Sequence, residues 1–419
     1  RAVQAAMSPP TGPVFLSLPV DVQTAPAAGL NLTPPRMPDS HVRPPKEPLH
    51  RAAQILAAAK NPAILVGNRV QEADAVAELV AVAEQLGAPV IHEATTSHGR
   101  CSFPSDHPLY AAPLPFWAPD VRDRLQPYDV LLVAGMKLLQ QYIFHEPNRP
   151  IPEHARIVQI DDTAWELGKN YPVEVGLVGH PKTSLEELAA ELSTAMTGQQ
   201  RQAIRIRSER IQREHKQQRT ALRDSAKVQQ QLRPITPLCA MESLARVLPP
   251  NAAVVEESPT TTMGSYFERT AALKNTDGYF AQRGWALGWG LNCAIGVQLA
   301  WPDRPVLAVI GDGSAMYGIQ GLWTAARYRI PVTFVITNNR EYRILKDCAQ
   351  VLRLPASLDN RFEGLDLDGP NIDFVALARS LGIQAEQVEA PDTLSDAVKQ
   401  SLAGDQPRVI EVAVRRPQN

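Results

Sequence analysis

Two stretches decide the fold: Pro305-Val306-Leu307-Ala308-Val309-Ile310-Gly311-Asp312-Gly313-Ser314 and, about two dozen residues later, Thr337-Asn338-Asn339. The apolar runs over 305–310 and 332–336 each predict a buried parallel strand. Residues 321–329 between them predict a helix, so the segment is a strand–helix–strand unit. Asp312 follows the first strand and the paired Asn residues follow the second, at the carboxyl ends where open α/β sheets bind ligands.

The side chains at these strand ends are suited to a metal ion that bridges a diphosphate. The carboxylate of Asp312 and the amide oxygen of Asn339 are hard ligands of the kind that Mg²⁺ or Ca²⁺ takes. Gly311 and Gly313 let backbone N–H groups approach a phosphate closely, and the start of a helix adds positive partial charge. The alternative interpretation is an ordinary turn in which Asp312 caps a helix.

Length and composition set the broad class of protein. A chain of 419 residues, 44% hydrophobic and 21% charged, predicts a soluble globular protein of two or three domains. The net charge of -2 gives no global reason to bind nucleic acid or an anionic membrane, and no run of eighteen apolar residues predicts a membrane span. The four cysteines lack C-x-x-C spacing, which argues against zinc and disulfides and favours a cytoplasmic location.

The pattern along the chain predicts two parallel-sheet α/β units. In the first unit we expect strands over 63–66, 89–92, 130–134, 156–160 and 175–178, and helices over 51–59, 72–86 and 185–196. In the second we expect a helix over 239–247 and a further strand over 253–256. Residues 13–20 predict an isolated core strand, which cannot bury its own faces. The strand ends at 66–69 and 134–136 lack G-x-G-x-x-G, so a dinucleotide site is not expected.

Residues 199–233 are rich in Gln and Arg and leave two interpretations open. A basic helix of this kind could contact RNA. The segment contains no aromatic residue on which a base could stack, and this favours a solvated connecting helix.

The two motifs together resemble the diphosphate-binding signature of thiamine diphosphate enzymes, a GDG followed by NN. Other stretches look like thiamine diphosphate decarboxylases: 257–262, 284–300, 311–317 and 322–326, with 61–64, 86–90, 102–104 and 107–108 in the first unit. These stretches point to the benzoylformate decarboxylase family. The resemblance extends over nearly the whole chain and is tightest over 253–345.

The resemblance implies an α/β fold with a middle domain and a diphosphate-binding domain, each built on a parallel sheet. The boundaries we expect are 1–25 for a remnant of a pyrimidine-binding domain, 26–48 for a Pro-rich linker, 49–197 for the middle domain, 198–235 for a helical linker and 236–419 for the diphosphate- and Mg-binding domain. The glutamate that activates the cofactor in the family lies in the pyrimidine-binding domain, and no residue of this chain matches it. We therefore expect the chain to need that domain for activity.

The resemblance also implies a metal site. Asp312 and the side chain of Asn339 would bind Mg²⁺, with Ca²⁺ as a possible substitute, and the backbone carbonyl of Glu341 would be the third protein ligand. The carboxylate of Glu341 is the competing ligand. The family uses a main-chain oxygen at this position, which favours the carbonyl.

The remaining cofactor contacts follow from the same resemblance. Gly313, Ser314 and Tyr342 would contact the diphosphate through backbone or hydroxyl groups. Leu287 matches the bulky apolar residue that holds the cofactor in its bent conformation, and the main-chain carbonyl at Trp285 would bind the aminopyrimidine. Leu287 as an ordinary core residue is the alternative.

Three positions depart from the family pattern. Pro259 and Thr260 lie where the family has two hydroxyl residues that contact the diphosphate, and Pro259 has neither a hydroxyl nor an N–H to donate. His145 is the candidate for the histidine that assists proton transfer, although a gapless match places Ile143 there instead. Ile344 lies where the family lining is small, which predicts a tighter pocket.

The function implied is the non-oxidative decarboxylation of a benzoylformate-like 2-oxo acid to an aldehyde and CO₂, by a carbon–carbon lyase that uses thiamine diphosphate and Mg²⁺. One alternative is a related carboligase or lyase, or an enzyme like acetohydroxyacid synthase. Another is a non-catalytic cofactor-binding chain. The resemblance further implies a homo-oligomer, a dimer of dimers, with no nucleic acid or membrane partner.

Overall fold

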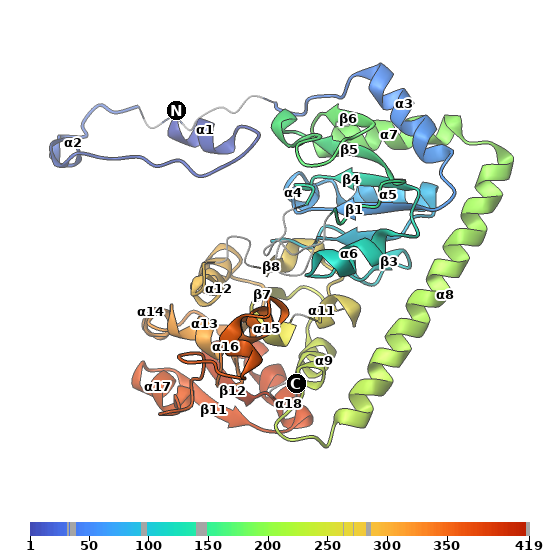
Figure 1. The fold of residues 1–419 in the computed structure, drawn as a ribbon. Coiled ribbons are helices and arrows are strands. Elements are labelled where there is room, and N and C mark those ends of the chain that lie inside the picture. Colours follow the sequence, from blue (N-terminus) through green and yellow to red (C-terminus); the bar gives the residue numbers. More distant parts are fainter. Residues whose placement is uncertain are drawn as a thin grey trace.

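The computed structural model describes residues 1–31, 33, 39–93, 99–139, 149–262, 264–270, 272–281 and 286–415. Its core is two six-stranded sheets, ordered β3-β2-β1-β4-β5-β6 and β11-β12-β10-β9-β7-β8. The strand pairings within both sheets are parallel. Figure 1 shows the two sheets in separate bodies linked by one long helix. The predicted class, α/β with two parallel-sheet domains, is confirmed.

The first sheet has helices on both faces. Its strands are β1 (Pro62–Val66), β2 (Val90–His92), β3 (Tyr110–Ala111), β4 (Val130–Ala134), β5 (Arg156–Asp161) and β6 (Val175–Val178). The helices around it are α3 (Lys46–Ala57), α4 (Arg69–Glu72), α5 (Val76–Leu86), α6 (Ala118–Leu125) and α7 (Pro181–Ala195), with a short 3₁₀ turn η1 (Ala164–Glu166). Ile64 of β1 packs in the core formed with α3, α5 and α7, whereas its neighbour Leu65 packs in the core that includes α6. Successive side chains of a strand point to opposite faces, so strands covered on both sides must be apolar throughout.

The second sheet carries the two motifs. Its strands are β7 (Ala253–Glu257), β8 (Tyr279–Ala281), β9 (Val306–Gly311), β10 (Val332–Asn338), β11 (Gln384–Val388) and β12 (Arg408–Ala413). The surrounding helices are α9 (Pro237–Val247), α10 (Pro259–Thr262), α11 (Tyr266–Arg269), α12 (Trp289–Ala300), α13 (Asp312–Met316), α14 (Gly321–Tyr328), α15 (Arg343–Val351), α16 (Pro355–Leu358), α17 (Phe374–Ser380) and α18 (Pro391–Leu402), with η2 (Thr276–Gly278). The apolar cores lie on the two faces, with α9 and α18 on one side and α12, α14 and α17 on the other.

The helix that links the two sheets is α8 (Gly198–Gln229), which is 32 residues long. Its first turn is closed by a reciprocal capping box between Thr197 and Gln200. Arg207 donates hydrogen bonds to the backbone carbonyls of Lys60 and Gly87, at 2.9 and 3.0 Å. This basic side chain of the segment therefore ties α8 to the first domain, as a connecting helix requires.

Two local predictions are wrong. Residues 11–19 form no strand, and α2 (Val20–Thr24) follows them after a short α1 (Ala2–Met7). The Phe15 side chain there is 93% exposed, since no neighbouring strand completes its hydrogen bonds or covers its faces. The helix expected over 72–86 begins only at Val76, as α5, because Asp74 adopts a positive φ of 51° and separates it from α4, which ends at Glu72. Across the described ranges, no helix is both long and apolar enough to cross a bilayer.

A buried polar cluster joins the two domains. Glu268 of α11 accepts hydrogen bonds through Oε2 from the Tyr110 hydroxyl, at 2.8 Å, and pairs with Nδ1 of His92 at 2.9 Å. All three residues are at most 2% exposed. Close by, the backbone N–H of Ser105 donates to the carbonyl of Leu273 at 3.0 Å. Buried polar groups of this kind stabilise one arrangement of the domains, because separating them leaves each group without its partner.

We predict that Tyr110→Phe, which removes only the hydroxyl, lowers the free energy of unfolding by about 1–2 kcal/mol. The thermal midpoint should fall by roughly 2–4 °C per kcal/mol for a domain of this size. The matched control is Tyr328→Phe, whose side chain is 70% exposed and should change the midpoint little. Equal midpoints for the two variants in differential scanning calorimetry would contradict the role given to the cluster.

Candidate functional site

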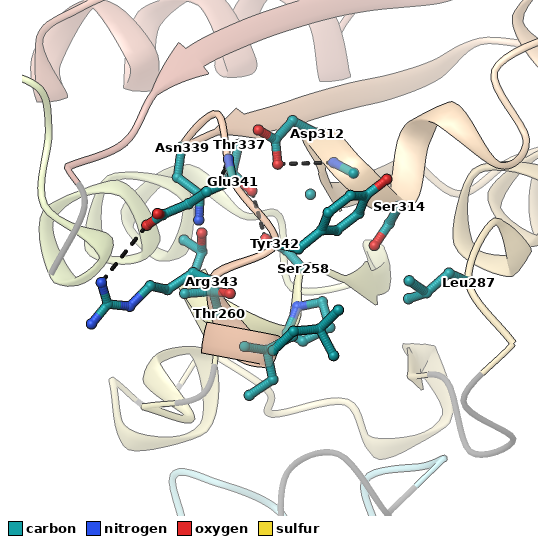
Figure 2. Close-up of a pocket in the computed structure, with 16 residues that line it drawn as sticks. Ser258, Thr260, Leu287, Asp312, Ser314, Thr337, Asn339, Glu341, Tyr342 and Arg343 are labelled. Carbon is teal, nitrogen blue, oxygen red and sulfur yellow. Dashed lines mark hydrogen bonds and ion pairs between the residues drawn. The ribbon is translucent and has the colours of Figure 1, made fainter. Parts of the chain in front are cut away.

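A pocket opens at the carboxyl ends of β7, β9 and β10, and Figure 2 shows the residues around it. Its lining comprises Ser258, Pro259, Thr260, Thr261, Leu287, Gly311, Asp312, Gly313, Ser314, Thr337, Asn339, Glu341, Tyr342, Arg343, Ile344 and Leu345. Of the ten residues that the sequence analysis assigned to the cofactor, nine are in this lining. The tenth, Trp285, lies outside the described residues, as does the catalytic candidate His145.

The pairing of β9 with β10 brings the two motifs together. In the register of this pair Gly311 lies opposite Thr337, so the residues that follow each strand start from the same edge of the sheet. Asp312 begins α13 directly after β9, and Asn339 directly follows β10. Both strands are buried along their length, which leaves only their ends to face the pocket.

Asp312 is a buried carboxylate that is held by backbone groups. It is 4% exposed; its Oδ1 accepts the N–H of Gly313 at 2.8 Å and its Oδ2 accepts the N–H of Arg340 at 2.7 Å. Burial raises the pKa of Asp312 to about 6, and the backbone hydrogen bonds oppose that rise. Within the described part of the chain it forms no ion pair with a basic side chain. A divalent cation would supply the positive charge that compensates this buried carboxylate, so Asp312 is suited to be a metal ligand.

The two Asn residues have different surroundings. Asn338 donates through Nδ2 to Oε1 of Glu411 on β12, at 2.7 Å, and accepts the N–H of Arg340 at 3.1 Å. Asn339 lines the pocket, and its Oδ1 accepts the N–H of Glu341 at 3.1 Å. Asn338 therefore joins β10 to β12, whereas Asn339 lines the pocket.

The Glu341 carboxylate is engaged away from Asp312. Its Oε2 lies 2.8 Å from Nζ of Lys346, which also binds Asp366 at 2.6 Å, and its Oε1 lies 3.9 Å from Arg343. Figure 2 shows the carboxylate turned toward Arg343. In the described residues no group of three or more His, Cys, Asp or Glu side chains could hold a metal ion. Because Lys346 already pairs with the Glu341 carboxylate, the Glu341 carbonyl is the better candidate for a metal ligand.

Gly313 allows a close approach of backbone and ring. A Cβ placed on Gly313 would lie 2.5 Å from Cε1 of Tyr342, so any side chain there would displace the ring. Ser314 follows in the pocket lining and is 5% exposed. Glycine at this position therefore lets the Tyr342 ring pack directly against the backbone of the turn at the pocket.

The wall opposite is formed by the residues after β7. The Ser258 hydroxyl lies 2.5 Å from the Thr337 hydroxyl, which joins this wall to the end of β10. Pro259 and Thr260 begin the short α10 and line the pocket together with Thr261. The proline therefore does lie at the pocket, and the hydroxyl groups beside it come from its neighbours.

The sequence analysis missed one functional candidate, Glu257. This last residue of β7 is 2% exposed, and its carboxylate accepts backbone N–H groups of residues 288–290, next to Leu287. Burial raises its pKa to about 6 against these hydrogen bonds. A Glu at the end of a buried strand is a signal that could have pointed to it.

Two parts of the chain match known families. Residues 49–188 match the thiamine pyrophosphate enzyme central domain, and residues 260–412 match the thiamine pyrophosphate enzyme C-terminal TPP binding domain. Over 413 residues the chain is 33% identical to benzoylformate decarboxylase of Pseudomonas aeruginosa. This alignment covers 98% of this chain and 72% of that protein. It is 26% identical to a probable acetolactate synthase large subunit of Methanocaldococcus jannaschii, over 96% of this chain and 66% of that protein.

A solved structure of a thiamine diphosphate enzyme is also similar to this chain. The thiamine diphosphate-dependent 4-hydroxybenzoylformate decarboxylase of Rhodococcus jostii superposes with a TM-score of 0.80 at 28% identity, over 100% of this chain and 73% of that one. With matches to the central and the TPP-binding domains and this identity over most of a curated relative, the chain belongs to the thiamine pyrophosphate enzymes.

Proposed function

We propose that the protein is a thiamine diphosphate- and Mg²⁺-dependent lyase that decarboxylates a 2-oxo acid to an aldehyde and CO₂. The observation that carries the proposal is the buried carboxylate of Asp312, without a basic partner among the described side chains, beside Asn339 at the ends of paired strands. The likeness to the two decarboxylases supports the choice of reaction.

The residues of the chain have distinct roles in this proposal. Asp312, the Asn339 side chain and the Glu341 carbonyl would hold Mg²⁺, and the backbone around Gly313 and Ser314 would hold the diphosphate. When bound, thiamine diphosphate supplies the carbon nucleophile and the electron sink for loss of CO₂.

Apolar side chains complete the site. Leu287 faces the pocket across from Glu341 and Arg343 (Figure 2), where it would hold the ring system of the cofactor in position. Ile344 and Leu345, at the start of α15, form an apolar wall that would limit the size of the substrate.

A related carboligase of the acetolactate synthase type is the second candidate. It is favoured by the 26% identity to a probable acetolactate synthase large subunit over 96% of this chain. Both candidates would use the same cofactor residues, so cofactor binding cannot separate them. Product analysis of the full-length protein with a 2-oxo acid alone, and with added aldehyde, separates release of an aldehyde from formation of a carbon–carbon bond.

We predict that Asp312→Asn weakens Mg²⁺-dependent binding of thiamine diphosphate at least about tenfold, or roughly 1.4 kcal/mol. The reason is that the amide removes the negative charge that the divalent ion needs. Isothermal titration of the full-length protein with thiamine diphosphate, at fixed Mg²⁺, measures the change.

The matched variant is Glu341→Gln, which retains a hydrogen bond acceptor for Lys346 and leaves the main chain unchanged. Its affinity should stay within about threefold of the wild type, less than 0.7 kcal/mol. An equal loss in both variants would show that the Glu341 carboxylate is a ligand and that the carbonyl assignment is wrong.

We predict that Ile344→Ala raises kcat/KM for benzoylformate relative to pyruvate. Removing three carbons from the wall makes room for an aromatic ring, and each methylene is worth about 1–3 kcal/mol in such a pocket. Steady-state kinetics with both substrates measures the ratio, which should rise at least about tenfold. A ratio that stays constant while both rates change would show that Ile344 does not limit substrate size.

A further inference from the structure

Glu257 is a buried carboxylate beside the pocket that binds only backbone groups in the described residues. Its Oε2 accepts the N–H of Gly288 at 3.2 Å and of Gly290 at 2.9 Å, and its Oε1 accepts the N–H of Trp289 at 3.2 Å. The acceptor lies in β7 and the donors lie about thirty residues later, at the start of α12. One side chain therefore binds three successive amides of a single turn.

The start of α12 depends on this outside acceptor. The first N–H groups of a helix have no partner inside it, and the N-cap residue here is Gly288, which has no side chain to accept them. Glu257 takes that role from a neighbouring strand. Its negative charge also complements the positive end of the helix dipole, so the carboxylate suits the position better than a neutral group.

The turn is closely packed on both sides, and its conformation requires glycine. Gly288 has a φ of +93°, and a Cβ there would lie 2.7 Å from Cβ of Tyr317. A Cβ on Gly290 would lie 2.6 Å from Cβ of Glu257. Asn292 donates to the carbonyl of Gly288 at 3.3 Å, so the same turn is held through its N–H groups and through a carbonyl.

Leu287 directly precedes this turn and lines the pocket. We propose that Glu257 is a positioning residue: it fixes the 288–290 turn and thereby holds Leu287 in the wall of the cofactor pocket. This inference rests on the proposed function, because Leu287 matters only where a cofactor lies against it. A helix cap that contributes stability alone is the alternative that the experiment must exclude.

The test is Glu257→Gln in the full-length protein. A glutamine keeps the shape but has one acceptor oxygen, and its amide nitrogen would face N–H donors. Hydrogen exchange at Gly288, Trp289 and Gly290 should become at least about tenfold faster, equivalent to 1.4 kcal/mol of lost protection. Exchange unchanged at these three amides would overturn the proposal whether or not the protein is active.

The second readout separates positioning from diphosphate binding. Affinity for inorganic pyrophosphate with Mg²⁺ should change less than about threefold, because Asp312 and Asn339 are untouched, while kcat falls at least about tenfold. The matched control is Asp373→Asn, which removes an exposed carboxylate that caps α17 of the same domain and accepts the N–H of Ala376 at 2.8 Å. It should leave kcat unchanged.

A double-mutant cycle tests whether Glu257 acts on kcat through Leu287. Glu257→Gln and Leu287→Ala should be non-additive, so that the double variant loses about as much kcat as the worse single variant. Losses that add would overturn the proposal. If Glu257→Gln does not fold, Glu257→Asp, whose shorter side chain withdraws the carboxylate from the three N–H groups of residues 288–290, replaces it in both measurements with the same expected results. A wild type that binds no thiamine diphosphate would instead overturn the proposed function.

Discussion

The structure of the site depends on one constraint, the parallel register of β9 with β10. Gly311 opposite Thr337 is the pair that sets Asp312 and Asn339 at the same edge of the sheet. The apolar side chains of these strands cannot shift along each other without leaving the cores on both faces. The cores of the second domain therefore fix the position of a carboxylate that is itself costly to bury.

The polar residues around that carboxylate are divided between structure and ligand binding. Glu411 engages Asn338, and Lys346 engages the carboxylate of Glu341, at 2.7 and 2.8 Å. Both pairs are buried, so each would be expensive to break. The pocket lining also contains Asp312 and Asn339, whose carboxylate and amide oxygens are hard ligands of the kind that a divalent cation takes.

Sequence predicted the elements that carry strong local signals. The runs over 305–310 and 332–336 are continuous, apolar and closed by Gly, Asp or Asn, and they match β9 and β10 to within two residues at each end. Residues 13–20 have the same apolar character, but a strand needs a neighbour, and local pattern does not report whether one is present. Asp74 adopts a positive φ that the helical pattern of the surrounding sequence does not predict.

The site was predicted to the extent that it is built from local motifs. The motif residues converge on one pocket, as their spacing and the resemblance implied. The role of Glu257 was not predicted, because its partners are backbone N–H groups about thirty residues away. Contacts with the backbone do not depend on the identity of the partner side chains, so the sequence does not indicate them. The position of the Glu341 carboxylate likewise depends on Lys346 of α15, which also pairs with Asp366 of a later loop.

A crystal structure of the full-length protein with thiamine diphosphate and Mn²⁺ tests the central claim most directly, because anomalous scattering locates this hard, octahedral ion without assumption. The account predicts one metal peak within coordination distance of Asp312, the Asn339 amide oxygen and the Glu341 carbonyl, with the diphosphate completing its shell. A peak on the Glu341 carboxylate, or Asp312 and Asn339 turned away from each other with the cofactor bound elsewhere, would contradict it.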